Sequence, residues 1–138
     1  MYIKKISYED FDGNKQVEDF YFNLTDTEIN RINAQYVGGL PYYINKIIRS
    51  GNTQQILPVL ENLVLSAYGE KTMDGRRFIK SDLLKEEFKQ TMAYDTLIRE
   101  LMSDPTGKVF SDFLINTLPK DTAAKLNYEL SKDNKFVE

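Results

Sequence analysis

The sequence contains no cysteine and no histidine among its 138 residues. Without cysteine the chain forms no disulfide, has no thiolate nucleophile and lacks the ligands of Cys/His zinc sites. Without histidine it lacks the side chain that most often acts as a general base near neutral pH. We therefore expect a protein that is not an enzyme, with no catalytic residues, no metal site and no cofactor.

Positive charge is not in excess, because 18 Lys and Arg stand against 21 Asp and Glu, a formal net charge of -3. General nucleic-acid affinity depends on an excess of basic residues, so we expect no nucleic-acid partner. No apolar run approaches the ~20 residues that cross a bilayer, and residues 1–5 lack the apolar core of a signal peptide. We therefore expect no membrane association, and the absence of cysteine fits a reducing cytoplasm.

The residues that are present predict one folded domain over residues 1–138. A hydrophobic share of 41% and a charged share of 28% are typical of soluble globular proteins, and a chain of this length buries roughly two-thirds of its unfolded surface. We predict an α+β fold that is predominantly α-helical. It comprises a β-hairpin over residues 2–22, five to six packed helices over residues 25–130, and a polar tail over residues 131–138.

The N-terminal hairpin is predicted from two strand-like stretches that flank Asp12-Gly13. This pair suits a two-residue type I′ turn between Phe11 and Asn14. Ile6 and Tyr8 would then share one face of the first strand, as Phe20 and Phe22 would on the second. A lone hairpin is marginal in water, so it must lie against helices or pair with another chain. Its edge is the first candidate contact surface.

The helices are predicted from capping residues and apolar spacing. Thr25 and Glu28 fit a capping box for the first helix. The strongest apolar stripe lies in residues 56–67, which predicts a central core helix. Residues 84–102 predict one long helix or two short ones, with a break near Ala93. Other boundaries are indicated by Gly38-Gly39, Pro41, Gly51, Ser81, Asp104-Pro105 and Pro119, with Asp104 expected to cap the next helix.

The stretch from Ser66 to Ser81 is more specified than a simple linker between helices requires. Gly69 stands where a helix would end in a left-handed residue, and Asp74-Gly75 is a tight-turn pair. Arg76, Arg77 and Lys80 could together hold an anion beside a helix start. The favoured alternative is that Arg76 and Arg77 pair with nearby acids such as Asp74 or Glu70.

Two other groups of side chains are candidates for function. Tyr42 is a candidate partner-binding residue, because tyrosine is enriched at interface hot spots, whereas Tyr43 shares a face with Ile47 and is expected in the core. The carboxylates of Asp95, Glu100, Asp104 and Asp112 could supply an acid–base pair. Nothing in their spacing selects two that converge, so we expect them to be solvated surface groups.

Several features in order carry a resemblance to a known family. They are Glu18-Asp19-Phe20-Tyr21-Phe22-Asn23-Leu24, a capped helix, the Gly-Gly break, Ser-x-Tyr-Gly-Glu-Lys at 66–71, Asp-Gly-Arg-Arg-Phe-Ile-Lys-Ser at 74–81, and Phe88-x-Gln90-Thr91-x-Ala93-Tyr94. This order resembles the tail assembly chaperones of long-tailed, siphovirus-type phages and prophages of Gram-positive bacteria. The similarity runs from about Phe20 to Pro119, and no single motif in it is diagnostic.

The resemblance implies a non-enzymatic assembly factor in the host bacterial cytoplasm that is not retained in the mature virion. Such proteins bind the tape measure protein, keep it soluble and assist polymerisation of the tail tube. The implied partners are the tape measure protein first, then the major tail tube protein and a second copy of the chain. The resemblance assigns no binding residues, so Tyr42, Arg76 and Arg77 are our own partner-binding candidates.

Two alternatives from other classes stay open at this point. A small phage-encoded regulator that binds nucleic acid through a helical pair is the first, and the acidic charge balance counts against it. An enzyme that acts through carboxylates is the second, and it requires a concave pocket with at least two convergent acids.

Overall fold

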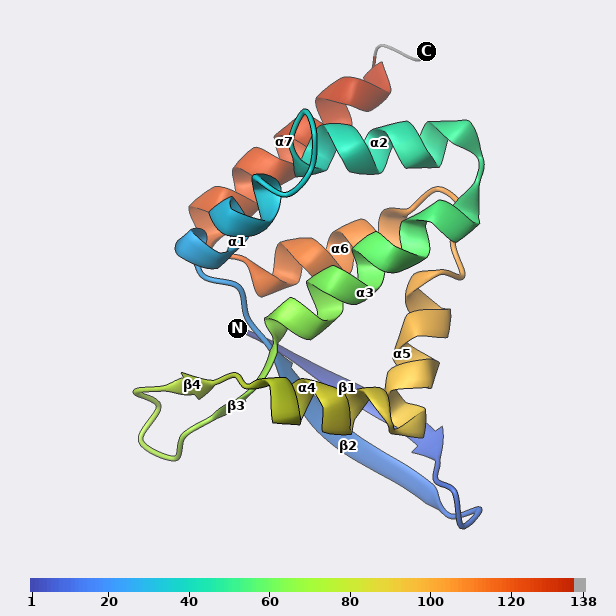
Figure 1. Cartoon of the computed structure of the whole chain (residues 1–138), viewed down its shortest axis with the longest axis vertical. Coiled ribbons are helices and arrows are strands. Elements are labelled where there is room, and N and C mark those ends of the chain that lie inside the picture. The colour runs from blue at the N-terminus through green and yellow to red at the C-terminus, as the bar shows by residue number, and fades with distance from the viewer. Residues whose placement is uncertain (136–138) are drawn as a thin grey trace.

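The computed structural model describes residues 1–135, and over this range the chain forms four strands, seven α-helices and one short 3-10 helix (Figure 1). The strands are β1 (Tyr2–Glu9), β2 (Lys15–Phe22), β3 (Tyr68–Lys71) and β4 (Phe78–Ile79). The helices are α1 (Asp26–Asn33), α2 (Leu40–Ser50), η1 (Thr53–Gln55), α3 (Ile56–Ala67), α4 (Asp82–Lys89), α5 (Met92–Leu101), α6 (Lys108–Thr117) and α7 (Lys120–Lys135). The predicted α+β class with its N-terminal hairpin is confirmed.

The helical boundaries follow from the capping residues in most places. Thr25 and Glu28 form the predicted capping box of α1, and Gly51 ends α2 with a left-handed φ of 71°. The segment 84–102 resolves into two helices, because the Thr91 hydroxyl accepts the Tyr94 N–H and begins α5 there. At the other end of the chain α7 runs to Lys135, into the segment expected as a polar tail, and residues 136–138 lie outside the described residues.

The predicted two-residue turn of the first hairpin is wrong. The Asp10 N–H donates to the Asn14 carbonyl at 2.8 Å and the Gly13 N–H donates to the Asp10 carbonyl at 3.0 Å, which closes a three-residue loop. Only Gly13 in this loop has a positive φ, of 82°, whereas a type I′ turn also requires one at Asp12. The Asp10 carboxylate accepts the backbone N–H groups of Asp12 and Asn14, which stabilises the longer loop.

The two faces of the first hairpin differ as predicted. Ile6 and Tyr8 of β1 and Phe20 and Phe22 of β2 all point to the helical side of the sheet, and Phe22 is fully buried there. The Phe22 ring lies 5.1 Å from the Phe113 ring, centroid to centroid. The hairpin is therefore stabilised by helical packing on one face, which meets the requirement that a lone hairpin be covered.

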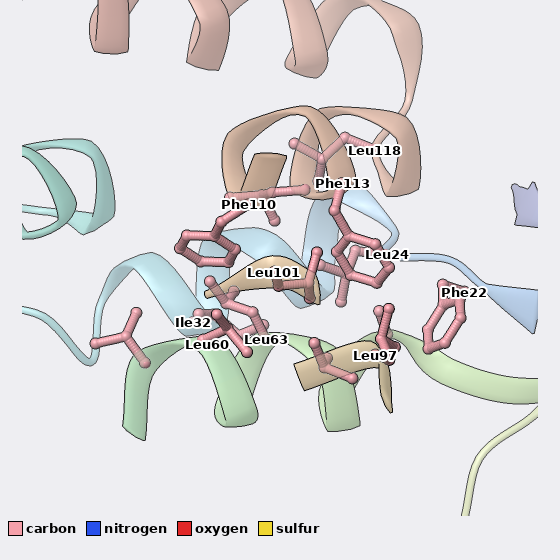
Figure 2. Packing of buried hydrophobic residues seen from close by; sticks show 14 of the residues in the cluster. Phe22, Leu24, Ile32, Leu60, Leu63, Leu97, Leu101, Phe110, Phe113 and Leu118 are labelled. Atoms are coloured by element: carbon pink, nitrogen blue, oxygen red, sulfur yellow. The ribbon is translucent and has the colours of Figure 1, made fainter. Parts of the chain in front are cut away.

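The hydrophobic core lies between the sheet and the helical layers, with α3 at its centre. Leu60, Leu63 and Val64 of α3 are essentially inaccessible to solvent, which confirms the predicted core helix. Figure 2 shows their neighbours converging from other elements of the chain. The labelled side chains are Phe22, Leu24, Ile32, Leu60, Leu63, Leu97, Leu101, Phe110, Phe113 and Leu118. Such packing fixes the helices relative to the sheet.

A second hairpin, β3–β4, follows directly from α3 and was not anticipated from the sequence. The sheet order is β1-β2-β3-β4, with all neighbouring strands antiparallel. The predicted left-handed helix end at Gly69 is wrong, because α3 ends at Ala67 and Tyr68 is already extended. A Cβ at Gly69 would lie 2.7 Å from the Ile79 carbonyl oxygen and 2.7 Å from the Phe78 ring. Close packing of β4, rather than a special φ, thus requires glycine.

Two further predictions about turns and caps have different outcomes. Gly75 has a positive φ of 73° and the Ser81 hydroxyl accepts the Leu84 N–H at 3.1 Å, so the tight turn and the cap of α4 are confirmed. Asp104 does not cap a helix, because α6 begins only at Lys108, after a left-handed Gly107. Its carboxylate instead accepts the N–H and hydroxyl of Thr106 and stabilises the loop before α6.

Candidate partner-binding surfaces

Lys80 is the most constrained cation near the second hairpin. Its Nζ donates to the Asn23 carbonyl, the Ser66 carbonyl and the Glu28 carboxylate, each at 2.7 Å. Burial lowers the pKa of Lys80, and the contact with Glu28 partly offsets that effect. Because three oxygens already occupy this ammonium group, Lys80 connects β4 to the ends of β2 and α3 and is not available to an external anion.

Arg76 and Arg77 lie in the turn between β3 and β4. The Asp74 carboxylate accepts the Thr72 hydroxyl and the Arg76 backbone N–H, and the Arg77 N–H donates to the Thr72 hydroxyl. The hydrogen bonds that the Asp74 carboxylate accepts from the Thr72 hydroxyl and the Arg76 N–H lower the pKa of Asp74. Neither guanidinium forms an ion pair among residues 1–135, so the favoured pairing with Asp74 or Glu70 is wrong. The backbone of the pair shapes the turn.

Tyr42 lies on α2, on the opposite side of the molecule from the β3–β4 turn (Figure 1). Its side chain is 54% exposed, and its ring covers Gly38, where an added Cβ would lie 2.7 Å from the ring. Tyr43 is partly buried and packs its ring 4.9 Å from that of Tyr36, centroid to centroid. Of the two neighbouring tyrosines, Tyr42 is therefore the exposed one. The structure does not bring it together with Arg76 and Arg77.

The carboxylates considered for catalysis do not converge. Glu100 pairs with Lys4, while Asp95 and Asp112 form separate i,i+4 pairs along their own helices. Among residues 1–135 no group of three or more acidic side chains is placed to hold a metal ion. The cavity between α2, α3, α5 and α6 has a volume of about 30 Å³, which is room for only a few water molecules. These features offer no substrate pocket.

The described surface includes three open grooves. The helical groove, between α1, α2 and α7, has a volume of about 190 Å³. It is lined by Ile29, Asn30, Asn33, Leu40, Pro41, Leu118, Thr122, Lys125, Leu126 and Glu129. The hairpin-tip groove has a volume of about 320 Å³ and is lined by Tyr8, Asp10, Phe11, Glu87, Gln90, Thr91 and Met92. Both are open hollows whose exposed lining is mainly apolar.

The largest of the three is the β2–β3 wedge, of about 440 Å³, between the strands from which it takes its name. It is lined by Glu18, Asp19, Phe20, Tyr21, Tyr68, Gly69, Glu70, Lys71 and Met73. Figure 1 shows that β3 and β4 project away from the helices and diverge from β2. The rings of Phe20 and Tyr68 form an aromatic floor, and the fully exposed Met73 stands at the rim.

The sequence interpretation missed this wedge because it assigned residues 66–81 to a joint between helices. A partial signal was present, since the turn pair Asp74-Gly75 is followed by Phe78–Ile79, whose residues favour strands, as in a hairpin. The other strand, Tyr68–Lys71, gives no such signal, because Gly69, Glu70 and Lys71 are residue types that strands disfavour. No sequence pattern, however, indicates where two paired strands will diverge.

The helices and the comparisons with known proteins bear on the whole chain. Of the helices in residues 1–135, none combines the length and apolar character needed to cross a bilayer. A profile of the phage tail assembly chaperone family matches residues 1–137, so the chain belongs to this family of non-enzymatic assembly factors. Searches of curated proteins and of solved structures returned no significant match.

Proposed function

We propose that this tail assembly chaperone binds the tape measure protein, keeps it soluble and assists polymerisation of the tail tube around it. The major tail tube protein is then a second partner, and self-association of the chaperone is a further contact. The proposed setting is the cytoplasm of a Gram-positive host infected by a siphovirus-type phage, with the chaperone absent from the mature virion. Family membership supports this role without specifying the partner.

The observation that carries the proposal is the distribution of exposed apolar side chains. They are spread over the first hairpin, α2 and the loop before it, the β3–β4 turn, α4 and α7 instead of forming one pocket. The large ones are Met1, Ile3, Phe11, Val17, Val37, Tyr42, Met73, Leu83 and Tyr128. A long partner chain that must later be released is suited to several weak contacts, because their combined strength depends on simultaneous engagement. Shallow grooves such as those described above supply contacts of this kind.

The direct test is co-expression of the full chain with the tape measure protein of the same phage. We expect the tape measure protein to move from the insoluble to the soluble fraction and to co-purify with the chaperone. No gain in solubility together with no co-purification would contradict the proposal. A salt-sensitive shift of DNA mobility at physiological ionic strength would instead support the nucleic-acid-binding regulator.

A further inference from the structure

Among residues 1–135, the edge of β2 that faces β3 has no strand partner along most of its length. β3 pairs with β2 only at Tyr21–Gly69 and Phe22–Tyr68, and its following residues, Glu70 and Lys71, pair with β4. A continued register would place Lys71 opposite Asp19, but the strands separate before that point. The β2–β3 wedge opens where the separation occurs.

The hairpin register shows which backbone groups of β2 point into the wedge. Asp10 and Asn14 form the hydrogen-bonded pair next to the loop. Because hydrogen-bonded and non-hydrogen-bonded pairs alternate in an antiparallel ladder, the N–H and C=O groups of Val17 and Asp19 point away from β1. Asn23 fits the same alternation, because its N–H also points away from β1 and donates to the Ala67 carbonyl at 2.8 Å. An open edge of this kind can accept an added strand.

The charge of the wedge indicates what kind of strand fits it. Burial raises the pKa of the Tyr68 hydroxyl, and the negative charges of Glu70, Glu87 and Glu18 raise it further. Lys71 also lines the wedge, with its Nζ donating to the Thr72 carbonyl at 3.1 Å, and is a single cation against the three carboxylates of the lining, Glu18, Asp19 and Glu70. An entering strand with positive charge is therefore favoured.

The same charges argue against a second copy of this chain as the occupant. The β2 strand of another copy would bring its own acidic pair at positions 18 and 19 into a groove that already contains three carboxylates. Like charges that face each other across an interface are unfavourable and select against the wrong partner.

We propose that the β2–β3 wedge binds an extended segment of the tape measure protein, which adds as a strand to β2 and directs a lysine or arginine side chain at Tyr68. This inference rests on the proposed function and specifies the partner segment by its chemistry. The rings of Phe20 and Tyr68, whose centroids are 6.4 Å apart, provide the aromatic surface for that cation. Met73 at the rim provides a flexible apolar contact for the neighbouring side chains of the segment.

The test uses the full chaperone chain and labelled peptides of about 15 residues that tile the tape measure protein, a length that covers a strand and its flanks. Fluorescence anisotropy identifies the binding peptides, and we expect them to contain lysine or arginine. Glu70→Lys should weaken their binding by about tenfold or more, because it places a positive charge beside the incoming cation. Asp112→Lys, an equal charge change at an exposed residue of α6 that lines none of the three grooves, should leave binding within about twofold of the wild type.

A second pair of variants isolates the backbone contact. Asp19→Pro removes both the carboxylate and the N–H that points into the wedge, whereas Asp19→Ala removes the carboxylate alone. Proline is tolerated where a strand N–H faces away from its neighbour, and thermal melting verifies that both variants fold. Asp19→Pro should bind the peptides about tenfold more weakly than Asp19→Ala, as expected for loss of a strand hydrogen bond.

The outcomes separate this inference from the function on which it rests. Soluble tape measure protein combined with equal peptide binding by the wild type and Glu70→Lys would overturn the wedge site alone. Equal binding by Asp19→Pro and Asp19→Ala would overturn strand addition. Self-association that Asp19→Pro abolishes, with no peptide bound at the wedge, would assign the edge to a second copy and overturn the proposal. Failure to solubilise the tape measure protein would instead contradict the proposed function.

Discussion

The two hairpins of the sheet are built in different ways. β1 and β2 pair over eight residues each, and one face of this hairpin is covered by helices that bury Ile6 and Phe22. β3 and β4 pair at only two positions, Glu70–Ile79 and Lys71–Phe78, and their turn projects into solvent (Figure 1). The first hairpin is held by packing, whereas the second depends on the few polar contacts at its base and turn.

This difference indicates how one small sheet can serve two purposes. A hairpin with a buried face fixes the position of the helices and tolerates little change. A short projecting hairpin contributes little to the core, so its divergence from β2 can leave a groove open for a partner. On this account the second hairpin depends on a few identifiable residues.

The largest expected effect is that of Lys80→Met. The substitution preserves most of the side-chain volume but leaves the Asn23 carbonyl, the Ser66 carbonyl and the Glu28 carboxylate without their shared donor. We expect the free energy of unfolding to fall by about 2–3 kcal/mol, the cost of leaving partly buried acceptors unpaired. Chemical denaturation measures the loss.

The matched control for this prediction is Lys5→Met, which removes the same group from an exposed site. The Lys5 Nζ lies 3.8 Å from the Asp19 Oδ1, and 70% of the Lys5 side chain is exposed. A pair of this kind contributes about 0–1 kcal/mol. Equal losses in the two variants would show that Lys80 does not anchor the second hairpin.

Gly69→Ala should have the next largest effect. The added Cβ meets the Ile79 carbonyl oxygen and the Phe78 ring at distances that require β4 to shift. We expect a loss of about 1–3 kcal/mol in the free energy of unfolding, typical of overpacking. The measurement is again chemical denaturation.

Gly75 supplies the comparison, because nothing lies within 4 Å of a Cβ added there and its constraint is a positive φ. Asparagine tolerates left-handed conformations better than alanine does. Gly75→Asn should therefore be milder than Gly75→Ala, while Gly69→Asn should be at least as damaging as Gly69→Ala. The same order at both sites would contradict steric packing as the reason for Gly69.

A smaller effect is expected in the pH dependence of stability. Burial raises the pKa of Glu28, but hydrogen bonds from Lys80 and from the Thr25 N–H outweigh it, so the folded-state pKa is lowered. The unfolded chain then binds more protons than the folded chain at acid pH. The stabilisation is complete above the unfolded pKa of about 4.3 and is lost as pH falls through the lower folded value.

Glu28→Gln tests this dependence and preserves the capping box, since glutamine also serves at this position. We expect the free energy of unfolding of this variant to vary less with pH below about 4.3 than that of the wild type. Denaturant titrations at several acid pH values measure the two slopes. Identical slopes would show that the Lys80–Glu28 contact does not shift the titration of Glu28.

Tyr42→Ala should have the smallest effect on stability. The side chain is about half exposed, so we expect a change within about 1 kcal/mol in the free energy of unfolding. Capture of the tape measure protein in a pull-down should weaken, whereas Lys46→Ala, at an exposed residue of the same helix that lines none of the grooves, should leave it unchanged. Unfolding of Tyr42→Ala would show that this tyrosine belongs to the core.

Local chemistry explains which parts of the fold were predictable. Thr25, Ser81 and Gly51 act through contacts within a few residues, and their predicted roles are confirmed. The predicted roles of Gly69 and Asp104 are wrong, because each residue is determined by a contact outside the helix end to which it was assigned. Gly69 is required by a strand that arrives ten residues later in sequence, at Ile79, and Asp104 is occupied by Thr106 before the helix begins.

The candidate binding residues show the same limit. Exposure of Tyr42 could be predicted from helical spacing, because that depends on one helix and its neighbours. The wedge could not be predicted from helical spacing. It depends on where β3 leaves β2 and on the side chain of Lys80, which bonds to Glu28 and Asn23, 52 and 57 residues before it in the sequence. Long-range contacts of this kind leave no periodic pattern.

Hydrogen exchange of the full chain, free and in complex with the tape measure protein, tests the contrast between the two hairpins most directly. Strand addition at the wedge predicts new protection of the Val17 and Asp19 amides on binding, with the amides that already bond to β1 changing little. The Glu70→Lys variant should show much less of this protection. Protection confined to the helical groove between α1, α2 and α7, with Val17 and Asp19 unchanged, would contradict the assignment of the wedge as the binding site.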